Sequence, residues 1–214
     1  MTPIRILSEH TSKKVYASAL DWPGIARSGR DEAAALEALA AALPRYRPIA
    51  AAAGHPLPDD AELVVTERIE GDASTAFGVP AKIADADREP VDAEAGARMA
   101  DLLAACWDAL DAIAKTAPEE LRKGPRGGGR DRDKVVRHVT DAEGAYAASM
   151  GRKHKPETPE AIAAMRADLL DVLRQPSDGS PIAGRRWPPR YAARRIGWHV
   201  MDHAWEIEDR SDPA

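Results

Sequence analysis

The chain has 214 residues and a mass of 23.0 kDa, enough for one or two domains with a buried core. Hydrophobic residues make up 44% and charged residues 30%, which is typical of a globular protein and argues against global disorder. The net charge of −5 argues against a general nucleic-acid binder. No apolar stretch approaches the roughly 18 residues that a membrane span needs. With Cys106 as its one cysteine and no N-terminal run of signal-peptide type, we expect a cytoplasmic protein.

The first 87 residues mix strand-like runs with one strongly helical segment. Alternating and β-branched residues predict strands over 4–8, 14–20 and 62–69. The alanine-rich segment 33–43 predicts a helix, with Ser28 or Asp31 as its N-cap. Pro44 disturbs this run, so we expect a second, short helix over 48–53. Residues 71–87 carry no clear pattern.

From residue 88 onward the sequence predicts four amphipathic helices. Apolar residues at three- and four-residue steps form one stripe on each of the segments 92–115, 131–150, 159–174 and 190–209. Thr158 and Pro159 fit the N-cap and first position of the third helix. Four such helices in about 120 residues indicate a four-helix bundle. We therefore expect an α+β protein with a small α/β domain over 1–87 and a helical bundle over 88–214.

Histidines in two of these helices form a candidate metal site. His199 and His203 lie four residues apart, which places both imidazoles on one helix face, about 6 Å apart along the axis. They share a stripe with apolar residues, and His138 lies on the inward face of the second helix. Three such rings can bind one metal ion and leave a position open for water or substrate. Packing of the histidines in the core is the alternative at this point.

Other polar residues near these histidines are weaker candidates. A metallopeptidase motif requires Glu directly after the first histidine, where this chain has Val200. Glu206 lies three residues after His203 and either orients its ring or sits on the solvated rim, which we favour. The spacing from His138 places Glu143 off to one side. Cys106 fits a small core residue.

The connector over 123–132 is rich in glycine and arginine and precedes the second helix, whose N-terminus attracts anions. Its arginines are Arg126, Arg130 and Arg132. We name Arg130 as a cofactor-binding candidate for a carboxylate or phosphate. A plain flexible link is the more common structure for such a loop. The Gly-Lys-Ser/Thr ending of a phosphate-binding loop is missing.

Two segments carry a family resemblance. KVVRHVTDAEGAY at 134–146 and WHVMDHAWEIEDR at 198–210 resemble the DinB-like superfamily of helical bundles. The resemblance covers about residues 92–209 and implies an up-down-down-up four-helix bundle. It also implies that His138, His199 and His203 bind a divalent metal ion, Zn or Ni. For function it implies a transferase, or a related enzyme such as an isomerase, that uses a low-molecular-weight thiol on a small-molecule substrate; metal-assisted hydrolysis is the close competitor.

The N-terminal half has a second resemblance. YASALDWPGIARSGRDEAAALEAL at 16–39 is similar to the HicB-like antitoxin domain, an α/β module that binds partner proteins. The matching residues are Asp21, Pro23, Gly24, Gly29 and Glu32. This resemblance implies an accessory or dimerising unit, and a homodimer is compatible with it. The alternative to an enzyme is therefore a non-catalytic binding or stress-response module, with the metal structural or absent.

Overall fold

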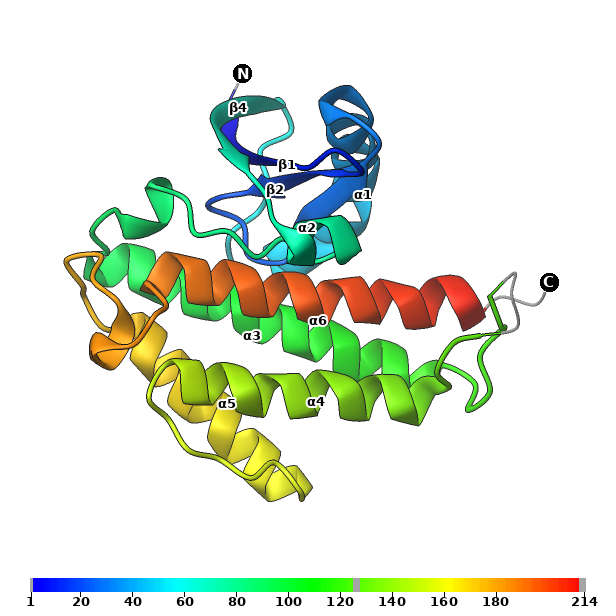
Figure 1. The fold of residues 1–214 in the computed structure, drawn as a ribbon. Helices are drawn as coiled ribbons and strands as arrows, with labels where there is room; N and C mark the ends of the chain where they lie inside the picture. The colour runs from blue at the N-terminus through cyan, green and yellow to red at the C-terminus, as the bar shows by residue number, and fades with distance from the viewer. Residues whose placement is uncertain (1, 125–127, 212–214) are drawn as a thin grey trace.

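The computed structural model describes residues 2–124 and 128–211 and has the expected α+β class (Figure 1). Its sheet consists of β1 (Thr2–His10), β2 (Val15–Ala19), β3 (Ala26–Gly29) and β4 (Ala61–Glu70). The strand order is β3-β2-β1-β4. The pair β1 and β4 is parallel, whereas the other two pairs are antiparallel. Helix α1 (Glu32–Ala52) packs against β2 and β3.

The predicted helix break at Pro44 is wrong, because α1 continues through both Pro44 and Pro48. A proline has no N–H and leaves the carbonyl four residues earlier without its helical partner. Ala40, Pro44 and Pro48 all lie on the exposed side of α1, so the freed carbonyls of Ala40 and Pro44 face water. Asp31 caps the helix by accepting a hydrogen bond from Ala34 N at 2.9 Å. Ser28, the other cap candidate, instead belongs to β3, a strand that the sequence analysis did not predict.

Residues 71–87, which showed no pattern, contain helix α2 (Ala73–Phe77) and the start of the 3-10 helix η1 (Ala86–Arg88). A buried carboxylate on β1 holds this segment. Glu9 accepts hydrogen bonds from the Thr75 hydroxyl and, at 3.3 Å, from the backbone N–H groups of Ala81 and Lys82. Burial raises the pKa of Glu9. The conformation of this segment therefore depends on Glu9, which lies more than 60 positions earlier in the chain.

Four long helices follow, close to their predicted bounds: α3 (Ala93–Thr116), α4 (Arg132–Ser149), α5 (Pro159–Arg174) and α6 (Pro189–Ser211). A 3-10 helix, η2 (Ile182–Gly184), precedes the last of them. Figure 1 shows α3 and α6 next to the sheet half of the chain, with α4 and α5 on their far side. Thr158 caps α5 as predicted, since its hydroxyl accepts from Ala161 N at 3.2 Å.

One hydrophobic core joins the two halves of the chain. Buried residues from β2, α1, α3, α4, α5 and α6 belong to a single contact cluster. At its centre, Tyr46 of α1 donates a hydrogen bond from its hydroxyl to Pro23 O at 2.6 Å, and Cys106 of α3 approaches the same carbonyl at 3.6 Å. The predicted boundary near residue 87 therefore crosses a shared core, and the division into two domains stays a prediction.

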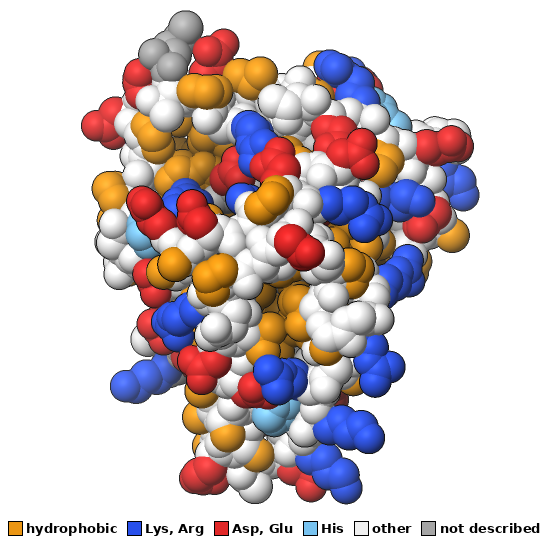
Figure 2. Space-filling view, turned by 90° about the vertical axis from the view of Figure 1, so that its left-hand side faces the viewer, with side chains coloured by type: hydrophobic (Ala, Val, Ile, Leu, Met, Phe, Trp, Pro, Cys, Tyr) orange, Lys and Arg blue, Asp and Glu red, His pale blue; other side chains and the backbone are white. Residues whose placement is uncertain are grey.

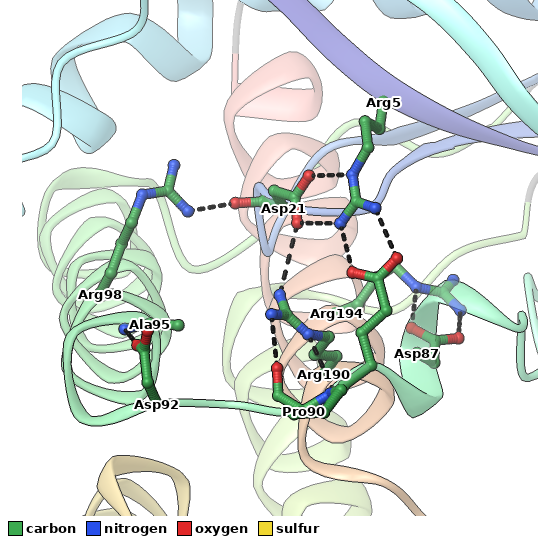
Figure 3. Close-up of polar contacts among 10 residues, drawn as sticks. Arg5, Asp21, Asp87, Pro90, Asp92, Ala95, Arg98, Arg190 and Arg194 are labelled. Atoms are coloured by element: carbon green, nitrogen blue, oxygen red, sulfur yellow. Dashed lines mark hydrogen bonds and ion pairs between the residues drawn. The ribbon is translucent and has the colours of Figure 1, made fainter. Parts of the chain in front are cut away.

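Charged side chains add a second junction between the sheet and α6 (Figure 3). Arg5 of β1 donates to Asp21 at 2.8 and 2.9 Å and to Glu89 at 2.7 and 3.0 Å. From α6, Arg194 donates to Asp87 at 2.6 Å, and both of these side chains are fully buried. Removing one partner of a buried ion pair typically costs about 3–5 kcal/mol. An arrangement of α6 and η1 that separated these two side chains and kept them buried would therefore be strongly disfavoured.

One face of the molecule carries side chains of both charges. On the face in Figure 2, Lys and Arg side chains are interspersed with Asp and Glu. That face consequently presents no broad patch of a single sign. Within the described residues, no helix combines the length and the apolar character of a membrane span.

Substitution of Gly197 tests the contact between α6 and the loop before β3. A Cβ at Gly197 would lie 2.8 Å from Gly24 N and 2.9 Å from the Pro23 carbonyl carbon. Because both are backbone atoms, Gly197→Ala should destabilise the protein by about 1–3 kcal/mol in urea unfolding. Gly144→Ala on α4 is the matched control, because its Cβ would meet Pro156 at an ordinary 3.4 Å and helix propensity should raise stability. Equal effects of the two substitutions would contradict the close packing.

Candidate metal centre

The three predicted histidines meet at one point between α4 and α6. One ring nitrogen from each of His138, His199 and His203 lies within 4.8 Å of the other two. The ring centroids are 4.7, 4.9 and 5.2 Å apart. The helices run in opposite directions here, because His138 lies closer to His203 than to His199, while Tyr146 further along α4 contacts His199 at 5.6 Å. The structure thus brings together the whole set that the sequence named.

Burial lowers the pKa of two rings of this cluster, His138 and His199. His199 is 6% exposed, and His138 and His203 are partly exposed. Desolvation is the main cause that lowers the pKa of His199 to about 2, and the nearby positive charge of Arg195 acts in the same direction. Desolvation also lowers the pKa of His138. Unprotonated imidazole is the form that binds a metal ion, so the fold holds His199 ready as a ligand at neutral pH.

A carboxylate orients one of the rings. His203 Nδ1 lies 2.7 Å from Glu206 Oε2, which leaves Nε2 as the nitrogen that is free for a ligand. The other oxygen of Glu206 accepts from Arg210 Nη1 at 2.7 Å, and Arg210 Nε donates to Arg122 O at 2.8 Å. The Glu206 side chain is 30% exposed and so does lie at the rim, but its carboxylate also pairs with His203, the role that we favoured less. Sequence analysis missed Arg210, although its spacing of four from Glu206 was a usable signal.

The free nitrogens fit a metal ion. His199 Nδ1 is buried and has no hydrogen-bond partner among residues 2–124 and 128–211. Buried polar atoms are almost always paired, so such an atom calls for a partner. A divalent ion bound through this nitrogen would supply one. Imidazole nitrogens suit Zn and Ni alike, and a set of three leaves a tetrahedral ion one position for another ligand.

Arg130 lies just before the first residue of α4, close to His138 of the three-histidine cluster. It lines a shallow hollow of about 500 Å³ of mixed charge, together with His138, Lys134, Arg137, Asp133 and Asp141. Its positive charge also contributes to lowering the pKa of His138. The proposed cofactor contact of Arg130 remains a prediction. Of its two companions in the connector, Arg126 lies outside the described residues, and Arg132, the first residue of α4, donates to Ala117 O at the end of α3 at 2.8 Å.

Two further candidates have structural roles. Glu143 is buried and accepts from Trp107 Nε1 at 2.7 Å and from Arg166 Nε at 3.1 Å, away from the three histidines. Cys106 is fully buried, and burial raises the pKa of its thiol. A buried thiol of raised pKa is a poor nucleophile, in agreement with the core position predicted for it.

No family model matches the chain, and neither does any curated protein or solved structure. The resemblances to the DinB-like and HicB-like families therefore stay predictions from short motifs. The geometry of the three histidines carries the functional argument.

The depressed pKa of His199 predicts how stability depends on pH. In metal-free protein the folded ring stays neutral, whereas the unfolded chain protonates it near the ordinary pKa of 6.5. The unfolded state therefore binds the extra proton, and stability should fall by about 1.4 kcal/mol between about pH 7.5 and pH 5.5 because of this ring. The measurement is urea unfolding at both pH values after dialysis against a chelator. His199→Gln should remove this part of the pH dependence, and an unchanged dependence would contradict the burial of a neutral ring.

Proposed function

We propose that this protein is a divalent-metal-dependent enzyme that acts on a small molecule with the help of a low-molecular-weight thiol. His138, His199 and His203 would hold the ion, zinc or nickel. The observation that carries the proposal is the meeting of three ring nitrogens within 4.8 Å of one another. Three protein ligands with a position left open are typical of reactive metal sites, whereas structural zinc sites use four.

The directions of the long helices support a bundle of the DinB-like type. Arg98 near the start of α3 and Arg190 at the start of α6 both donate to Asp21. Further along the same two helices, Cys106 and Met201 both lie against Gly24. These contacts mean that α3 and α6 run in the same direction.

The other two helices run against this pair. Near the start of α3, Gly96 lies against the backbone of Arg174 at the end of α5. On α4, the opposite direction to α6 follows from the contacts of His138 and Tyr146. An up-down-down-up order accounts for these contacts, which supports the proposed family resemblance.

The chain's own residues would position and protect the ion and its ligand. A divalent ion held here would lower the pKa of a bound thiol or water and act as a Lewis acid. Glu206 keeps the His203 ring in one orientation, and burial keeps His199 unprotonated. The rings of Tyr146 and Trp198 lie 5.6 and 5.9 Å from the His199 ring and shield it from solvent.

Metal binding is the first test of this proposal. Wild-type protein should bind about one Zn²⁺ or Ni²⁺ per chain in competition with a chromogenic chelator, and the alanine variants of His138, His199 and His203 should each lose that binding. Glu206→Gln should weaken it by about 10–100-fold, because it loosens the His203 ring without removing a ligand. His154→Ala is the matched control, since His154 pairs with Asp168 elsewhere. Equal metal affinity in all of these variants would contradict the site.

Catalysis requires a separate measurement. We expect metal-loaded protein to speed the reaction of a thiol, such as glutathione or mycothiol, with a small electrophile above the uncatalysed rate. His199→Ala and His203→Ala should return the rate to background, while His154→Ala should not. Because the cosubstrate is a choice among several thiols, the assay tests a panel of thiols and measures the consumption of each. Activity that survives both site variants would remove the three histidines from catalysis.

A further inference from the structure

Arg195 lies one turn before His199 on α6 and has no acidic partner within the described part of the chain. The contrast with its neighbour is direct, because Arg194 is buried and donates to Asp87 at 2.6 Å. The Arg195 guanidinium instead lies against two aromatic rings, with Cζ 5.0 Å from the centroid of Tyr146 and 4.7 Å from that of Trp198. Stacking occupies the face of a guanidinium and leaves the N–H donors at its edge available.

Three polar atoms on this stretch of α6 are buried without a hydrogen-bond partner in residues 2–124 and 128–211. They are Arg195 Nη1, Trp198 Nε1 and His199 Nδ1; the last is the nitrogen already assigned to the proposed ion, so the first two carry the present inference. A buried polar group that is left unpaired destabilises the folded chain. Their grouping over five residues next to the three histidines indicates a place that a ligand completes.

The nearby carboxylates on α6 have other partners. Glu206 is committed to His203 and Arg210. Asp202 lies 3.9 Å from Arg27 of β3. Arg195 therefore keeps an uncompensated positive charge beside the histidines, and that charge is among the causes that lower the pKa of His199.

We propose that Arg195 binds an anionic oxygen group, a carboxylate or a phosphate, on the molecule that occupies the histidine site. The donors of a planar guanidinium match the paired oxygens of both groups. Spacing of four residues separates the backbone positions of Arg195 and His199 by about 6 Å along the helix axis, so one small molecule can reach both side chains. The inference rests on the proposed function for the identity of the occupant, and it adds that the occupant carries negative charge.

The test uses metal-free protein, so that it does not depend on the ion. Sodium propionate and inorganic phosphate are titrated at constant ionic strength while NMR follows the indole N–H of Trp198, which Trp198→Phe assigns. A saturable shift with either anion, and none with uncharged propionamide, is expected. The tighter of the two anions identifies the group as carboxylate or phosphate. Arg195→Gln should weaken the response about tenfold or more, and Arg195→Lys should retain part of it.

Arg30→Gln is the matched control, because it removes one positive charge from a side chain that is 89% exposed near the start of α1. It should leave the titration unchanged. Where Arg195→Gln does not fold by circular dichroism, the comparison of Arg195→Lys with Arg30→Gln decides. Anion titrations that are equal in wild type and in the folded Arg195 variants overturn the inference, even if the metal binds. A response that depends on Arg195 in a chain that binds no metal upholds the inference and rejects the proposed function.

Discussion

Helix α6 is packed on two sides at once, and the rest of the structure depends on this constraint. On one side Gly197 lies against the backbone of Pro23 and Gly24, at a distance that leaves no room for a Cβ. On another side His199 and His203 face His138 of α4. Both contacts belong to one rigid helix. The packing of α6 against the loop between β2 and β3 therefore fixes the position of the histidines along the helix axis, and their rotation about it, relative to α4. The sheet half thereby helps to position the candidate metal centre, although it contributes no ligand to it.

The polar groups of this helix are arranged so that most of them are paired before any ligand binds. Arg194 is matched by Asp87, and Glu206 links His203 to Arg210. Buried polar groups without partners are costly, and proteins keep few of them. Arg210 keeps one unpaired atom, Nη2, near the end of the helix, whereas the unpaired atoms of Arg195, Trp198 and His199 lie together. They mark the part of the helix where the folded chain is incomplete by itself.

Much of the helical half could be predicted from the sequence, because long amphipathic helices carry a strong periodic signal. The meeting of the histidines was predictable for the same reason, since spacing and inward stripes define which side chains face one another. The course of α1 through Pro44 was not, because it depends on which side of the helix faces water. Strand β3 was missed because ARSG contains no β-branched residue. The role of Arg195 was hidden because it consists in the lack of a partner, which only a folded structure reveals.

The family resemblances and the geometry bear on different parts of the account. Helical spacing identified His138, His199 and His203 and the motifs added the expectation of a divalent metal ion, while the structure supplies their distances, burial and the contact with Glu206. The most direct test of the central claim is a crystal of protein loaded with Zn²⁺ or Ni²⁺, measured on both sides of the metal's absorption edge. We predict one anomalous-scattering peak between α4 and α6, about 2.0–2.1 Å from a nitrogen of each of the three rings. A loaded crystal with no peak there, or with the peak on other residues, would contradict the account.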